Sequence, residues 1–214
     1  MSPSDDLVTA LGHVRDLSTR YKSGESDAFD AFRDLVSLLL GGTILDTAHS
    51  AVRLIYGPGS DVVLGGRGGP TDPLPLTNGR YLRLSIALYR ETTSEGPRVK
   101  VRSSSIQYQH DPAGDRWIFR YDYLRNPPDP YPACHVQIRG TLIESSVMNL
   151  ERVHFPTHRV SLEAVIRLLI EEFGVPARTG AEFWRSVLAE SEAAFLEIHR
   201  RSLSGPGAGP GRPE

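Results

Sequence analysis

The side chains best suited to acid–base or anion chemistry gather in one stretch of the chain, residues 115–159. Two segments in it, 115–123 and 134–143, alternate polar and apolar residues, which is typical of half-buried β-strands. Successive side chains of a strand point to opposite faces, so the polar residues of each segment should share a face. If the strands pair with their apolar sides together, one polar surface holds Arg120, Asp122, His135, Gln137 and Arg139.

This polar surface has the composition of an anion-binding and proton-transfer site. His135 is its proton-transfer group, and we place Asp122 with it as a candidate catalytic residue. Arg120 and Arg139 supply fixed positive charge and are candidate substrate-binding residues, so the cluster could stabilise an anionic transition state, for example at phosphate. The alternative is a solvated sheet face whose cross-strand charge pairs contribute only to stability.

A histidine pair follows, with His154 and His158 on either side of Phe155-Pro156-Thr157. Histidines four apart on a helix can chelate a metal, but Pro156 and the extended sequence around it argue against a helix. A zinc site would need a third ligand, such as His135 or Cys134, which the sequence does not place nearby. We therefore predict no metal and no cofactor, with zinc at the histidine pair as the open alternative.

The end of this stretch immediately precedes a predicted helix that starts at Ser161. A helix N-terminus favours anions, because its backbone N–H groups are free and its dipole is positive there. His158 therefore joins the catalytic candidates, and Arg159 joins the candidate substrate-binding residues. The alternative is a polar loop leading into a capped helix.

The elements that must position these residues begin with three helical patterns in residues 1–56. Apolar residues recur at helical spacing from Leu7 to Leu17, with the helix ending near Gly24. A second helix should start at Ser26-Asp27 and stop at Gly41-Gly42. Residues 44–56 keep the same period and predict a third helix. Residues 57–79 are dense in glycine and proline, lack a phosphate-binding fingerprint, and predict a connecting loop with at most a short strand at 62–64.

A β region follows, in residues 80–155. Strands are predicted at 81–90, 99–110, 115–123 and 134–143, with a possible fifth at 150–155. The apolar phase slips within the second strand, which predicts a β-bulge near Ser103-Ser104-Ser105. Trp117 and Trp184 are expected in the core. Two helices are predicted in residues 160–202, and the glycine- and proline-rich tail 205–214 should be disordered.

The fold class is therefore α+β: a curved antiparallel sheet of four or five strands, arranged as a meander, with the N- and C-terminal helices packed on one face. We predict a single domain over residues 1–204. Its 214 residues are 39% hydrophobic and 23% charged, which is ordinary for a globular protein.

Composition excludes several classes of function. The formal net charge of −2 gives no global attraction to nucleic acid or to an anionic membrane, so such binding would need a local basic face. Lysine occurs only at Lys22 and Lys100 among 24 basic residues, as in a GC-rich bacterial coding sequence. Cys134 is the single cysteine, which excludes a disulfide framework. With no signal-peptide pattern and no apolar run near 20 residues, we expect a cytoplasmic protein that does not engage a membrane.

The motif IFRYD at 118–122, followed by a histidine-containing strand and HFPTHR at 154–159, resembles small bacterial proteins of the TumE-like toxin class. The resemblance covers about residues 81–172. It implies a toxin–antitoxin-related protein that processes nucleic acid, with RNA or a cognate antitoxin-like protein as partner. The alternative is a non-enzymatic module that binds a protein or a ligand and regulates it, so enzymatic activity stays open.

Overall fold

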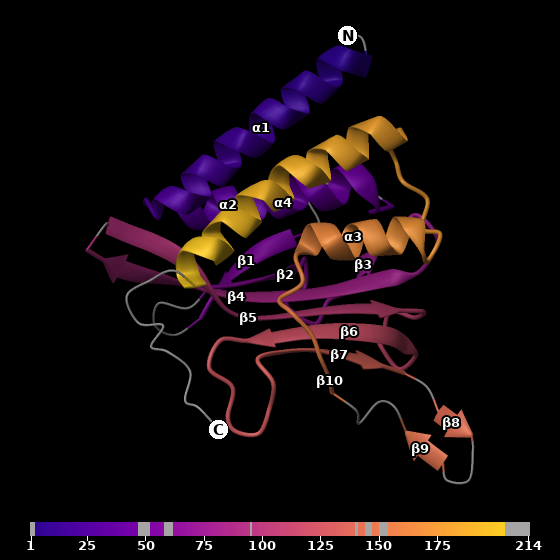
Figure 1. The fold of residues 1–214 in the computed structure, drawn as a ribbon. Helices are drawn as coiled ribbons and strands as arrows, with labels where there is room; N and C mark the ends of the chain where they lie inside the picture. Colours follow the sequence, from indigo (N-terminus) through magenta and orange to yellow (C-terminus); the bar gives the residue numbers. More distant parts are fainter. Residues whose placement is uncertain are drawn as a thin grey trace.

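A layer of helices covers one face of an antiparallel sheet (Figure 1). The structure is a computed structural model, and it describes residues 3–46, 52–57, 62–94, 96–139, 141–143, 147–149 and 154–203. Within these residues the helices are α1 (Pro3–Ser23), α2 (Ala28–Thr43), α3 (Leu162–Glu171) and α4 (Ala181–Leu203). The class is α+β, as the sequence predicts.

The sheet has eight strands in the described part of the chain, so the prediction of four or five is too low. Its order is β1-β2-β4-β5-β6-β7-β10, and β3 pairs with β4 beside β2. The bounds are β1 (Val52–Tyr56), β2 (Val62–Gly66), β3 (Leu74–Pro75), β4 (Tyr81–Thr93), β5 (Gly96–Gln109), β6 (Trp117–Leu124), β7 (Cys134–Ile138) and β10 (Phe155–Pro156). A separate hairpin joins β8 (Thr141–Ile143) to β9 (Val147–Asn149).

The additional strands come from two segments that were predicted otherwise. The third helix over 44–56 is wrong, because Val52–Tyr56 forms β1 and pairs antiparallel with β2. Helix α2 also runs through Gly41-Gly42 to Thr43. The predicted loop 57–79 contains β3, which was not predicted, and β2, which extends the short strand considered at 62–64 to Gly66. Its glycines allow a close turn: a Cβ at Gly66 would lie 2.4 Å from the backbone oxygen of Asp72.

The first three main strands and the bulge are confirmed, whereas the predicted strand 134–143 is only partly correct, because β7 ends at Ile138 and Thr141–Ile143 forms β8 of the separate hairpin. Ala87 pairs with Ser103, but the next residue, Leu88, pairs with Val101, so Arg102 is the extra residue beside the serines. A second shift, between Tyr108 and Gln109, leaves Ile118 as the extra residue on β6. The prediction that Trp117 lies in the core is wrong, and the second bulge explains why. Ile118 packs against the core instead, whereas Trp117 is only partly buried and lies outside it. Trp184 is in the core at 4% exposure, as expected.

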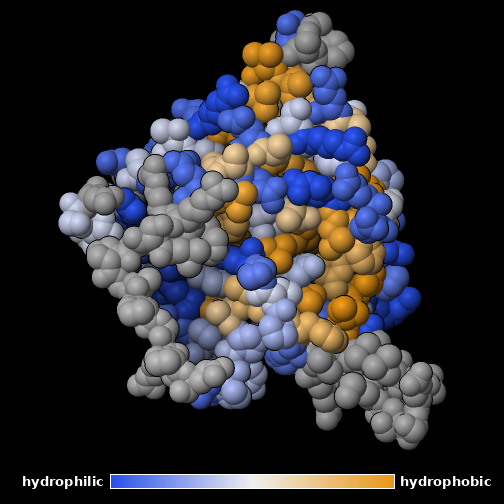
Figure 2. Space-filling model, viewed as in Figure 1, coloured by the Kyte–Doolittle hydropathy of each residue, from blue (hydrophilic) through white to orange (hydrophobic). Residues whose placement is uncertain are grey.

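The core lies between the helices and the sheet. Apolar residues of α1, α2, α3 and α4 pack on the alternate residues Leu82, Leu84, Ile86 and Leu88 of β4 and on their neighbours in β5 and β6. Figure 2 shows apolar side chains gathered on this side of the molecule where α3 meets the sheet. Burying each large side chain contributes about 1.5–3 kcal/mol, so this layer dominates stability.

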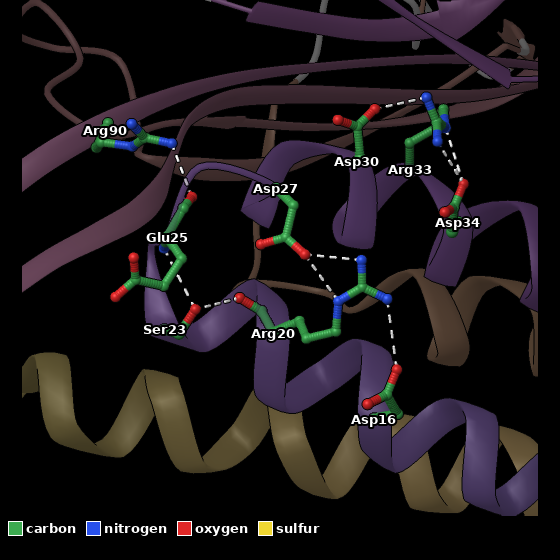
Figure 3. Close-up of polar contacts among 9 residues, drawn as sticks. All are labelled: Asp16, Arg20, Ser23, Glu25, Asp27, Asp30, Arg33, Asp34 and Arg90. Atoms are coloured by element: carbon green, nitrogen blue, oxygen red, sulfur yellow. Dashed lines mark hydrogen bonds and ion pairs between the residues drawn. The ribbon is translucent and has the colours of Figure 1, made fainter.

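Ion pairs fix the first two helices against each other and against the sheet (Figure 3). Arg20 of α1 contacts Asp16 in its own helix and, at 2.7 Å, Asp27 at the start of α2. Asp27 is the N-cap residue, yet its carboxylate binds Arg20 rather than the helix backbone. Arg90 of β4 donates to the backbone oxygen of Glu25. Exposed pairs of this kind add little free energy, so their main effect is on orientation.

Some predictions fall outside the described residues. They include the disordered tail 205–214 and most of the possible strand at 150–155, of which only Phe155–Pro156 is described, as β10. None of the described helices is both long and apolar enough to cross a membrane.

Candidate functional site

Strand pairing lines up polar residues in two rows across the open face of the sheet, opposite the helices. The first row is Arg83, Gln107, Arg120 and Gln137, on β4, β5, β6 and β7. The second row is Ser85, Ser105, Asp122 and His135 on the same strands. The predicted pairing of the two polar segments is therefore correct, and it makes Arg120 and Asp122 direct cross-strand partners of Gln137 and His135.

The second row lines a shallow groove of about 360 Å³. Its other walls come from Ser103 and Ser104 beside the bulge of β5 and from Arg120, Tyr123 and Leu124 of β6. Sequence reasoning missed the serine hydroxyls as site groups. The signal was present, because Ser103 and Ser105 alternate on the same side of β5 once the bulge has shifted the phase.

Asp122 is the centre of the polar contacts in the groove. Arg120 donates from Nε to Asp122 Oδ2 at 2.7 Å, and His135 Nε2 lies 3.5 Å from the same oxygen. The Asp122 and His135 side chains are 20% and 14% exposed, so both are largely shielded from water but still open to the groove. Low exposure strengthens such charge contacts relative to bulk water.

Arg120 links this pair to a third polar group. Its Nη2 also donates to Gln137 Oε1, and Gln137 Nε2 lies 3.2 Å from His154 Nε2. The guanidinium is thus held on two sides, which fixes its direction and leaves its remaining N–H groups for a ligand. A preoriented arginine binds an anion with less loss of side-chain entropy than a mobile one.

His154 belongs to this site rather than to a pair with His158. Its ring centroid lies 4.5 Å from that of His135 and 5.6 Å from that of Tyr131. The Nδ1 atoms of His135 and His154 are both buried and have no hydrogen-bond partner among the described residues. No group of three histidine, cysteine or acidic side chains suited to a metal occurs within the described ranges, so the zinc alternative gains no support.

Three of the six predicted site residues meet in the groove, and three lie elsewhere. Arg139 follows the end of β7 with an exposed side chain, and its backbone N–H donates to Ile118. His158 is exposed on the connection from β10 to α3. Arg159 lies on the helix-covered side, where its Cζ is 4.4 Å from the Tyr123 ring centroid and 5.1 Å from that of Phe195. The connection from β10 to α3 crosses from the sheet edge into the helical layer, which separates His158 and Arg159 from the groove, whereas Arg139 lies beyond the end of β7.

Cys134 lies next to His135 but on the opposite side of β7. Burial raises the pKa of its thiol, and the charge of Arg159 offsets this only in part. A raised pKa leaves less thiolate at neutral pH, which lowers the reactivity of this thiol.

The comparisons with known proteins decide nothing further. No protein-family model, curated protein or solved structure matches this chain. The likeness to TumE-like toxins stays a prediction, and function must be argued from the groove. A carboxylate, an imidazole and a guanidinium within contact distance can together bind an anion and exchange a proton with it.

Proposed function

We propose that the groove on the open face binds a phosphodiester of RNA and that His135 and Asp122 exchange protons there during cleavage. The observation that carries this proposal is the contact of both His135 and Arg120 with one oxygen of Asp122, in a groove open to solvent. The proton-transfer pair and the fixed cation then act on the same bound group.

Binding is supported by cations and hydroxyls on the same face. Arg83 and Arg120 lie in one row on strands two apart, so their backbones are separated by about 10 Å. Arg83 donates to the backbone oxygen of Ala113, while its buried Nε has no partner among the described residues. The hydroxyls of Ser103 and Ser105 can donate to phosphate oxygens, as such groups do at nucleic-acid interfaces.

The chemistry would use the ribose itself as nucleophile. His135 would accept the proton of a 2′-hydroxyl as that oxygen attacks the adjacent phosphorus, and Asp122 would stabilise the resulting imidazolium. The bond from phosphorus to the 5′-oxygen would break, leaving a 2′,3′-cyclic phosphate, and the departing 5′-oxygen would take a proton from water. Arg120 would stabilise the negative charge that develops on the phosphate oxygens. RNA and DNA differ in this hydroxyl, so cleavage should be confined to RNA.

Binding without chemistry is the second candidate, and the contacts within the site favour it. Arg120 and His154 are already engaged by Gln137, and the Nδ1 atom of His135 is buried. The one ring nitrogen left for proton transfer, Nε2, faces Asp122. In this alternative the open face holds an acidic ligand or a protein partner such as an antitoxin.

The test measures cleavage and binding of a labelled single-stranded RNA in parallel, with the corresponding DNA as a control. For His135→Ala we expect cleavage to fall at least about 100-fold and affinity to change little. For Arg120→Gln we expect affinity to fall about tenfold, because a charge-assisted contact is lost. His13→Ala, an exposed histidine on α1, is the matched control and should behave as wild type.

The outcomes separate the candidates. Equal cleavage by wild type and His135→Ala would refute proton transfer at this site. Binding that depends on Arg120, without cleavage by any variant, would support the binding module. If the RNA binds neither wild type nor any variant, both RNA cleavage and RNA binding at the groove are refuted.

A further inference from the structure

A second cavity lies on the opposite side of the sheet, between it and the helices. It encloses about 80 Å³ and is bounded by α1, α2, β4, β5, α4 and the start of α3. Most of its wall is apolar, with Phe32, Leu35, Val36 and Leu39 of α2 facing Ile86 and Ile106 of the sheet. It shares none of the acid–base residues of the groove.

Four buried polar side chains line this cavity, and one of them has no partner. Ser161 accepts from the Ala164 backbone and donates to Glu192, and Ser191 donates to Glu163. Ser18 of α1 is 5% exposed, and its Oγ makes no hydrogen bond to any described residue. A buried hydroxyl without a partner costs about 1–3 kcal/mol, so a ligand atom that bonds to it would recover this cost.

Arg159 supplies a positive charge to the cavity wall. Its Cζ lies 4.4 Å from the ring centroid of Tyr123 and 5.1 Å from that of Phe195. Among the described residues no carboxylate forms an ion pair with it. Burial lowers the pKa of Arg159, because removal from water disfavours its charged form.

Water can fill only part of this environment. The cavity, at about 80 Å³, exceeds the roughly 10–15 Å³ that one water needs, and water at its polar end would leave the apolar wall without contacts. The acidic side chain of the wall does not supply the missing charge either, because burial raises the pKa of Glu163 and so favours its neutral form. An apolar body with one anionic end would satisfy the apolar wall, the hydroxyl and the guanidinium together.

We propose that this cavity binds a small aliphatic monocarboxylate, with its hydrocarbon chain between α2 and the sheet and its carboxylate on Arg159 and Ser18. Glu163 lies in the same wall, and its protonated form can donate to the ligand as an acid. An alkylamine would instead meet the guanidinium with like charge, so the site should select against it. Arg159 thus keeps a ligand-binding role, but at a site separate from the groove.

The test is calorimetric titration of the full chain with straight-chain carboxylates from butyrate to octanoate, and with hexanol and hexylamine as matched neutral and cationic probes. At least one carboxylate should bind, and hexanol and hexylamine should bind at least about tenfold more weakly than hexanoate. Arg159→Met keeps the length of the side chain and removes its charge, and it should weaken carboxylate binding about tenfold or more.

Two further variants keep the test decisive if Arg159→Met does not fold. Ala194→Leu should block binding, because it adds side-chain volume to the cavity wall. Arg185→Met is the matched control, because Arg185 also lies over an aromatic ring of α4 but is exposed and outside the cavity. This variant should bind carboxylates as wild type does. The proposal is overturned if no carboxylate binds, if Ala194→Leu binds equally well, or if hexylamine binds as tightly as hexanoate.

Discussion

The two faces of this one sheet present opposite chemistry from adjacent residues. On β7, Cys134 points toward the helices and His135 toward the open groove, and on β6 the buried Phe119 and the groove residue Arg120 divide in the same way. On the covered face a polar group without a partner stands out, because almost every other group there is apolar. On the open face the two rows of side chains are polar, so only specific contacts between side chains distinguish a binding site from a solvated surface.

The comparison shows which kind of observation is informative on each side. Beneath the helices, Ser18 Oγ has no hydrogen-bond partner among the described residues and points to a missing ligand, since buried polar groups are normally satisfied. On the open face, the informative feature is convergence, with Arg120 and His135 meeting at one oxygen of Asp122.

The largest expected difference between the faces is in stability. Leu84 and Ser85 are neighbours on β4, but Leu84 is 0% exposed beneath the helices, whereas Ser85 lies in the groove. Leu84→Ala should lower the free energy of unfolding by about 2–5 kcal/mol, because it leaves a cavity in the core. Ser85→Ala should change it by less than about 0.5 kcal/mol. Urea denaturation of the two variants gives the comparison, and similar losses in both would mean that the faces are wrongly assigned.

A smaller difference is expected within the covered side, between two glutamates. Burial raises the pKa of Glu163, so wild type should lose stability as pH rises from the ordinary glutamate pKa towards the raised value. Glu163→Gln has no such group, and its stability relative to wild type should increase over the same rise in pH. Thermal unfolding at a series of pH values measures this trend.

Glu192 is the control with the opposite sign. Burial tends to raise its pKa, but hydrogen bonds from Arg167 and Ser161 outweigh this and lower it. Its stabilisation is therefore present above the ordinary glutamate pKa and lost as pH falls. Glu192→Gln should be less stable than wild type by about 1–2 kcal/mol near neutral pH, with the difference shrinking in acid. If both variants showed the same pH trend, the assigned environments would be wrong.

Sequence reasoning recovered the strands with strict alternation and failed where patterns were ambiguous. Period-two alternation in β6 and β7 predicts both their faces and the convergence of Arg120, Asp122 and His135. The helical period of residues 44–56 was misleading, because a five-residue strand such as β1 is too short to distinguish the two periods. The dense glycines near Gly66 concealed only the end of β2, where close packing requires them.

Relations between distant segments were beyond what one sequence supplies. His154 stacks on His135 because β10 pairs with β7, and no local pattern predicts that pairing. Arg159 was assigned to the open site from its place before a helix, yet the chain turns there and carries it beneath the helices. Local periodicity determines the face of a residue within a strand, but not the path of a connection.

The central claim is that the open face, and not the helical layer, binds a phosphodiester. The most direct test is NMR chemical-shift mapping of the isotope-labelled protein while a short single-stranded RNA is added. The account predicts that the backbone amides of 103–105, 120–122 and 135–137 shift together and those of 187–195 do not. Shifts confined to the helical layer, or no shift at any RNA concentration, would contradict it.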